Sequence, residues 1–131
     1  MALIISRATK VQLLAWAVQA HPVECCGLIF GDKSQIEEVE LVVNISTNPR
    51  TSFEIEPAAL LAAEKRDRAG ERFLMGYFHS HPNGAPQPSD TDAAMASTDG
   101  RYWLIVARDD VTAWRFESDS KFKQYEMVTA D

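Results

Sequence analysis

Residues 75–92 read Met-Gly-Tyr-Phe-His-Ser-His-Pro-Asn-Gly-Ala-Pro-Gln-Pro-Ser-Asp-Thr-Asp, and this stretch decides how the rest of the chain is interpreted. The apolar and aromatic segment 73–78 predicts a buried strand that leads into His79 and His81. Residues two apart on a strand project from the same face, so both imidazoles are expected to point the same way. Pro82 ends the strand, because proline cannot donate a ladder hydrogen bond.

The segment after the histidines can return a carboxylate to them. Residues 83–88 include two prolines and a glycine and predict a loop. Ser89 and Asp92 are expected in the first turn of a short helix over 90–97. If the loop folds back, Asp92 approaches the two histidines. Two histidines and one carboxylate, with a fourth position open, are the ligand set of a catalytic zinc site.

Ser89 and Asp92 also fit a plainer interpretation. A serine at the N-cap followed three residues later by an acid resembles a capping box, which explains both residues without a metal. The two interpretations need not compete, because a residue in the first turn can cap the helix and still present its side chain outward. A His-x-His pair followed by a loop and Ser-x-x-Asp arises by chance far less often than a single histidine in a strand, which favours the metal site.

Length and composition exclude several classes of protein. A chain of 131 residues predicts one domain, residues 1–131, large enough to fold without disulfides. The formal net charge of −6, from 13 basic and 19 acidic residues, argues against nucleic acid or an acidic membrane surface as partner. No apolar run reaches the roughly 18 residues of a membrane span, and the N-terminus lacks the pattern of a signal peptide. We therefore expect a cytoplasmic protein.

A second informative stretch, residues 24–31, reads Glu-Cys-Cys-Gly-Leu-Ile-Phe-Gly and predicts a central strand. Glu24 at its start is most simply a surface acid. Gly27 inside the strand indicates a close approach of another chain segment. The adjacent Cys25 and Cys26 form no C-x-x-C pair and are expected to be small buried hydrophobic residues. Residues 36–45 are expected to pair with this strand as a hairpin.

The remaining chain predicts two longer helices and several strands. In a helix over 8–20, the residues Val11, Leu14, Ala15 and Val18 fall at helical spacing, and Leu13 and Trp16 widen the predicted buried stripe. A second helix is expected from Pro57 to Gly70, at positions typical of the first helical residue and of the C-cap. The expected strands are 3–5 at an edge, 52–55, a hairpin of 102–107 with 111–116, and a last edge strand over 125–128. This order predicts an α/β fold with one mixed, largely antiparallel sheet flanked by helices.

The sequence resembles the JAMM motif of the JAB1/MPN/Mov34 metalloenzyme family at five positions: Glu24 at the start of residues 24–31, His79 and His81 in His-Ser-His-Pro, and then Ser89 and Asp92. The resemblance covers nearly the whole chain and implies an MPN-like, cytidine-deaminase-like architecture. It implies a zinc-dependent peptidase or isopeptidase with His79, His81 and Asp92 as zinc ligands. Ser89 would bond the water or the oxyanion, and Glu24 would be the general base.

The resemblance also implies a class of substrate. Eukaryotic members of the family remove ubiquitin or ubiquitin-like proteins, and short prokaryotic members act on small ubiquitin-fold proteins, including sulfur carriers that end in Gly-Gly. The chain has no room for the insertions with which some members grip ubiquitin chains. We therefore expect hydrolysis after the C-terminal Gly-Gly of a ubiquitin-like or sulfur-carrier protein.

Two other classes of function stay open at this point. The first is a non-catalytic MPN-type binding or scaffold module, against which the intact set of five side chains argues. The second is another zinc hydrolase such as a nucleobase deaminase. Deaminases use His-x-Glu and Pro-Cys-x-x-Cys strings, and neither string occurs in the sequence.

Overall fold

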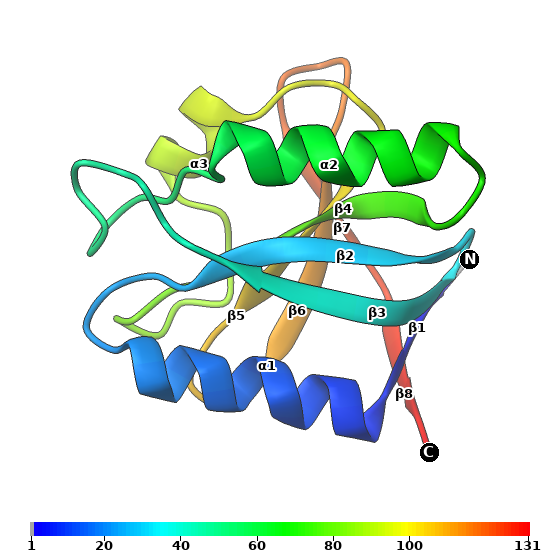
Figure 1. Cartoon of the computed structure of the whole chain (residues 1–131). Helices are drawn as coiled ribbons and strands as arrows, with labels where there is room; N and C mark the ends of the chain where they lie inside the picture. Colours follow the sequence, from blue (N-terminus) through cyan, green and yellow to red (C-terminus); the bar gives the residue numbers. More distant parts are fainter. Residues whose placement is uncertain (1) are drawn as a thin grey trace.

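The computed structural model describes residues 2–131, which form one eight-stranded sheet and three helices (Figure 1). In chain order the elements are β1 (Leu3–Ser6), α1 (Arg7–Ala20), β2 (Cys26–Asp32), β3 (Gln35–Val42), α2 (Pro57–Arg68), β4 (Phe73–Ser80), α3 (Asp90–Met95), β5 (Tyr102–Val106), β6 (Val111–Phe116), β7 (Phe122–Tyr125) and β8 (Met127–Ala130).

The sheet is mixed and largely antiparallel, as the sequence predicts. Its strand order is β7-β6-β5-β4-β2-β3-β1-β8. The pairs β2–β3, β2–β4, β5–β6 and β6–β7 are antiparallel, whereas β4–β5, β1–β3 and β1–β8 are parallel. Because β2 and β4 are antiparallel neighbours, the start of β2 lies beside the end of β4. This arrangement brings Glu24 to the same end of the sheet as the histidines.

Both predicted hairpins are confirmed, but the ends of the chain pair differently from expectation. Residues Leu3–Ser6 lie between β3 and β8 and not at an edge. The single strand expected over 125–128 is instead two strands, β7 and β8, at opposite edges of the sheet. The strand expected over 52–55 is only a bridge between Asn44 and Ile55. The parallel pairing of β1 with β8 joins segments far apart in the chain, so no local pattern signals it.

Helices α1 and α2 cover opposite faces of the sheet (Figure 1). In α1, Leu13 is fully buried, whereas Val11 and Val18 are 59% and 70% exposed. The prediction that Val11 and Val18 belong to the buried stripe was therefore wrong. Apolar residues occur on most sides of this helix, so spacing alone does not select a face. Trp16, stacked on Phe78 with ring centroids 5.8 Å apart, fixes the face that meets the sheet.

Helix α2 begins and ends as predicted. Pro57 is its first residue, and Gly70 follows its end in the left-handed conformation with φ of 74°. The helix packs Ala63 over Leu28, Phe30 and Leu74 of the sheet. None of the helices formed by residues 2–131 combines the length and the apolar character needed to cross a membrane.

The predictions for Cys25, Cys26 and Gly27 are confirmed, although the strand begins at Cys26 and not at Glu24. Cys25 and Cys26 are buried, unbridged, and belong to separate core clusters on the two faces of the sheet. At Gly27 a Cβ atom would collide with the backbone carbonyl oxygen of Glu40 in β3 and with the ring of Phe78, so a larger residue cannot stand there without moving these neighbours.

A β-bulge in β4 determines which face the histidines occupy. The pairing of β2 with β4 shifts register between Ile29 and Phe30, which leaves Met75 as an extra residue in β4. Leu74, before the bulge, packs on the α2 face, while Met75 packs on the α1 face. After the bulge the alternation is inverted, so His79 also lies on the α2 face, where the α3 region carries Asp92.

Candidate metal centre

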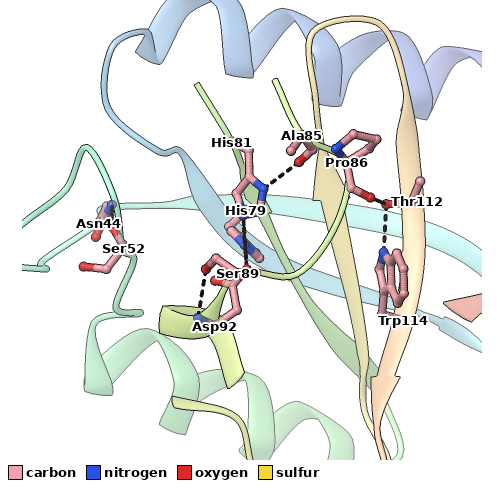
Figure 2. A network of polar contacts seen from close by, with 10 residues as sticks. All are labelled: Asn44, Ser52, His79, His81, Ala85, Pro86, Ser89, Asp92, Thr112 and Trp114. Atoms are coloured by element: carbon pink, nitrogen blue, oxygen red, sulfur yellow. Dashed lines mark hydrogen bonds and ion pairs between the residues drawn. The ribbon is translucent and has the colours of Figure 1, made fainter. Parts of the chain in front are cut away.

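Three side chains converge at the end of β4. His79 lies within the strand, His81 lies just beyond it, and Asp92 lies in the first turn of α3 (Figure 2). The two Nε2 atoms are 3.0 Å apart, and each is 3.1 Å from Oδ2 of Asp92. A tetrahedral zinc with bonds of about 2.0–2.1 Å holds its ligand atoms roughly 3.3 Å apart. The triangle of donors therefore fits a metal ion of this kind with only a small outward adjustment.

Asp92 is oriented by a complete capping box with Ser89. The backbone N–H of Asp92 donates to Ser89 Oγ at 3.0 Å, and the backbone N–H of Ser89 donates to Asp92 Oδ2 at 2.9 Å. The same carboxylate faces both histidines, so capping and metal binding are compatible in one residue. Ser89 is otherwise exposed, and its hydroxyl proton is not used by the cap.

His81 is oriented by the loop that follows it. Its Nδ1–H donates to the carbonyl oxygen of Ala85 at 2.7 Å (Figure 2). The next carbonyl, that of Pro86, accepts from Thr112 Oγ1 at 2.8 Å, and Trp114 Nε1 donates to the same Thr112 oxygen at 2.9 Å. When the proton of the neutral His81 ring is on Nδ1, its Nε2 carries no hydrogen and faces His79 and Asp92. This is the tautomer in which Nε2 can bind a metal.

His79 is held by aromatic packing. Its ring is fully buried and stacks on Phe53 with centroids 4.3 Å apart, and it meets Trp103 edge-on at 5.5 Å. Its Nδ1 has no hydrogen-bond partner among residues 2–131. The two rings therefore fix the direction of Nε2 where a hydrogen-bond acceptor would otherwise do so.

Glu24 is a buried carboxylate beside the three donors, and not the surface acid of the plainer interpretation. It is only 4% exposed and lies just before β2. Ser80 N–H donates to the Cys25 carbonyl at 3.0 Å, which extends the β2–β4 pairing so that Glu24 lies across from His81. Its Oε1 atom has no partner within the described chain. Burial raises the pKa of Glu24 to about 7, a value suited to accepting a proton from water near neutral pH.

The protonation states of Asp92 and His79 suit a cation. Burial pushes the pKa of Asp92 upward, but the contacts of its carboxylate with the His79 and His81 rings outweigh burial and hold this pKa well below its usual range. Burial lowers the pKa of His79. Burial opposes protonation of His81 as well, but its bonds to Asp92 and to the Ala85 carbonyl raise its pKa. An ionised carboxylate beside a neutral buried imidazole is the state in which such groups bind metal.

Two cavities flank this end of the sheet. A cavity of about 170 Å³ on the α2 face is lined largely by apolar and aromatic side chains, including Phe53 and Trp103, which pack on His79. A larger cavity of about 370 Å³ lies against α1, with the donor residue His81 as well as Ser80 and His21 in its lining. The smaller cavity therefore borders the rings that pack on His79, whereas the larger cavity borders His81 itself.

Sequence reasoning identified all five polar side chains at this site but missed the residues that orient them. Phe53 carried a weak signal, because it alternates with Ile55 in an otherwise polar segment. Ala85 and Thr112 carried none, since one contributes only a backbone carbonyl and the other lies on a strand distant in sequence.

A mixed sheet that brings two histidines and a carboxylate together, with a second buried carboxylate beside them, is the arrangement of a metal-dependent hydrolase. Residues 6–117 match the prokaryotic homologs of the JAB domain, and the chain belongs to this family. Together with the proteases among its relatives, this makes the chain a hydrolase of the JAMM type.

Relatives of known name and structure agree with this assignment. The chain is 33% identical over 102 residues to a desampylase of Haloferax volcanii, a match that covers 75% of this chain and 73% of that protein. It is 30% identical over 112 residues to a probable TtuB-protein conjugate cleaving protease of Thermus thermophilus, covering 86% of this chain and 74% of that one. A solved protein of Desulfitobacterium hafniense superposes with a TM-score of 0.84 at 26% identity, covering 98% and 93% of the two chains.

Proposed function

We propose that this chain is a zinc-dependent isopeptidase that hydrolyses the bond after the C-terminal Gly-Gly of a small ubiquitin-like or sulfur-carrier protein. The observation that carries the proposal is the triangle of donor atoms at 3.0–3.1 Å beside the unpartnered Oε1 of buried Glu24. Two imidazole nitrogens and one carboxylate oxygen form a common ligand set for catalytic zinc, with one position left for water.

In this proposal His79, His81 and Asp92 hold the zinc. When bound, the ion would lower the pKa of a water molecule to about 7 and polarise the scissile carbonyl. The cap from Ser89 and the carbonyl of Ala85 keep Asp92 and His81 in place while substrate enters.

Glu24 accepts the proton of the attacking water and returns it to the leaving nitrogen. Glu24 lies outside the group of donor atoms that are within 4.8 Å of one another, and its burial and free oxygen opposite His81 therefore support the role of a base over that of a fourth ligand. Ser89 donates its hydroxyl proton to the oxygen of the scissile carbonyl as charge develops there. That proton is available because the cap uses only an acceptor site of the hydroxyl.

The substrate class is supported by the relatives and by the shape of the site. One relative is named a desampylase and another a protease that cleaves TtuB-protein conjugates. The cavity of about 170 Å³ beside the site is lined by none of the donor residues, but it is small and borders Phe53 and Trp103, the rings that pack on His79. An extended tail without side chains fits such a space better than a bulky one, which favours glycines before the cleaved bond.

The test is cleavage of fusions in which small ubiquitin-fold proteins ending in Gly-Gly are joined to a short peptide. The zinc-loaded protein should release the peptide after the second glycine, as measured by mass spectrometry. Removing zinc with a chelator should stop cleavage, and adding zinc back should restore it. Replacing the second glycine of the substrate by leucine should slow cleavage sharply.

Glu24→Gln is the matched catalytic control, because it keeps size and hydrogen bonding but removes the base. It should keep its fold and its zinc and lose at least about a hundredfold in rate. Absence of cleavage by the zinc-loaded wild type across the panel would refute the proposed function. Equal rates for Glu24→Gln and wild type would remove Glu24 from the mechanism.

A further inference from the structure

The segment between β3 and α2, residues 43–56, is folded around the side chain of Asn44. The Nδ2 group of Asn44 donates to the carbonyl oxygens of Glu24 at 3.0 Å and of Ser52 at 3.1 Å. Its Oδ1 atom accepts from the backbone N–H groups of Ser46 at 3.0 Å and of Glu54 at 3.1 Å. These four bonds use both donors and both acceptor sites of the carboxamide. Figure 2 shows Asn44 and Ser52 together on this segment, to the left of the histidines.

The backbone of Glu24 is held by this segment on both sides. Its N–H donates to the carbonyl of Pro49 at 2.7 Å, and its C=O accepts from Asn44. Glu24 precedes β2, which begins at Cys26, so it is not itself part of the named strand. The backbone of Glu24 is therefore held by residues 43–56 as well as by the pairing of β2 with β4 at Cys25.

The same segment touches the metal centre at a second point. Phe53 follows Ser52 and stacks on His79 with ring centroids 4.3 Å apart. Asn44 ties together the two limbs of the segment, because it bonds both Ser46 near one end and Glu54 next to Phe53. A single carboxamide thus links the backbone of Glu24 to the ring that packs on His79.

We propose that Asn44 is a positioning residue that holds Glu24 in line with the attacking water, an inference that rests on the proposed function. The side-chain hydrogen bonds of Asn44 go to backbone groups and not to the donor atoms, so Asn44 acts through the backbone of Glu24. Without its two N–H donors, the carbonyl of Glu24 loses its partner and the segment loses the bond that closes it at Ser52. Displacement of a catalytic group by about 1 Å can lower a rate by about a hundredfold.

The test compares three variants by kcat, KM and zinc content on the Gly-Gly fusion. Asn44→Asp has the same shape but offers no N–H to the carbonyls of Glu24 and Ser52. Asn44→Ser has a smaller side chain that also lacks the Nδ2 donors, but unlike Asn44→Asp it introduces no negative charge. The matched control is Asn48→Ala, because the side chain of Asn48 is exposed and contacts only its neighbour Thr47, at 3.5 Å. We expect both Asn44 variants to keep one zinc and a KM within about twofold of wild type while kcat falls about ten- to a hundredfold. Asn48→Ala should match wild type.

A double variant separates positioning of Glu24 from a general loss of structure. In a Glu24→Gln background the base is already absent, so adding Asn44→Asp should lower kcat by less than about twofold. An equal loss in both backgrounds, loss of zinc in proportion to activity, or unchanged kcat in the folded Asn44 variants would each overturn the inference. If wild type itself fails to cleave, the proposed function fails first, and that outcome is recognised from wild type alone.

Discussion

Ser89 and Asp92 cap each other across the first turn of α3, and the Asp92 oxygen that accepts the Ser89 N–H at 2.9 Å also lies 3.1 Å from both histidine nitrogens. The helix start and the metal centre therefore share one atom. A short helix that is fixed in this way delivers its carboxylate in one orientation, because the backbone geometry of the cap leaves the side chain little freedom.

The two roles of Ser89 can be separated by comparison with a second serine cap. Ser6 caps α1 by accepting from the backbone N–H of Thr9 at 3.0 Å, far from the site. Ser89→Ala and Ser6→Ala should each lower the free energy of unfolding by about 1 kcal/mol, the usual cost of losing an N-cap. Only Ser89→Ala should also lower kcat on the Gly-Gly fusion. Urea unfolding and steady-state kinetics measure the two effects, and equal activity of both variants would leave Ser89 with the cap alone.

Metal content tests the donor set with a built-in control. Wild type should bind about one zinc per chain, and His81→Ala should bind far less, because two donors hold zinc much more weakly than three. The third histidine of the chain, His21, is exposed at the end of α1, so His21→Ala should keep the full amount. Elemental analysis after dialysis gives the answer. Similar zinc in wild type and His81→Ala would show that the donors are assigned wrongly.

The buried carboxylate of Glu24 predicts a pH-dependent stability in the metal-free protein. Burial raises its pKa from 4.5 to about 7 in the folded chain, so between these values the folded state binds a proton that the unfolded state releases. Stability from this group is full below about pH 4.5 and is lost as the pH rises to about 7. Glu24→Gln removes the dependence. Its advantage over wild type in unfolding free energy should grow by on the order of 2 kcal/mol between acid and pH 8. Urea titrations in chelator measure this, and parallel pH curves for the two proteins would contradict it.

Adding a single methyl group at Gly76 is expected to lower the stability of the protein strongly. A Cβ atom at this position would collide with the backbone of Tyr102 in β5, so Gly76→Ala must push β4 and β5 apart. We expect a loss of about 3 kcal/mol or more in unfolding free energy. Gly100→Ala is the control, because Gly100 has φ of 76° but open space around it. It should cost only about 1–2 kcal/mol, from backbone strain alone. Equal costs would mean that the strands yield easily.

The parts of the structure that the sequence predicted are those with local signals. The strand before His79, the two hairpins and the ends of α2 follow from alternation, turn residues and the positions of proline and glycine. The approach of Asp92 to the histidines followed from the length of the loop and the helix start. The face of α1 was misjudged because Val11 and Val18 have the same apolar character as Leu13, and only contacts across the sheet distinguish them.

The residues that support the site could not be predicted, because their contacts join distant parts of the chain. Asn44 bonds Glu24 through a backbone carbonyl, and Thr112 reaches the loop at Pro86 from β6. Backbone partners leave no trace in the residue type at their own position. The side chains that would perform chemistry are thus visible in the sequence, while the contacts that aim them become visible only in the fold.

The face of the sheet on which the metal centre forms depends on the extra residue Met75 in β4. If residues 74–79 formed a regular strand without the bulge, the strings His-x-His and Ser-x-x-Asp would be unchanged, yet both imidazoles would point toward α1, away from Glu24 and Asp92. Transplanting the centre onto another sheet therefore requires the number of residues upstream of the strings as well as the strings themselves. A search that scores only the spacing of the donors would accept chains in which those donors stand on opposite sides of a sheet and never meet.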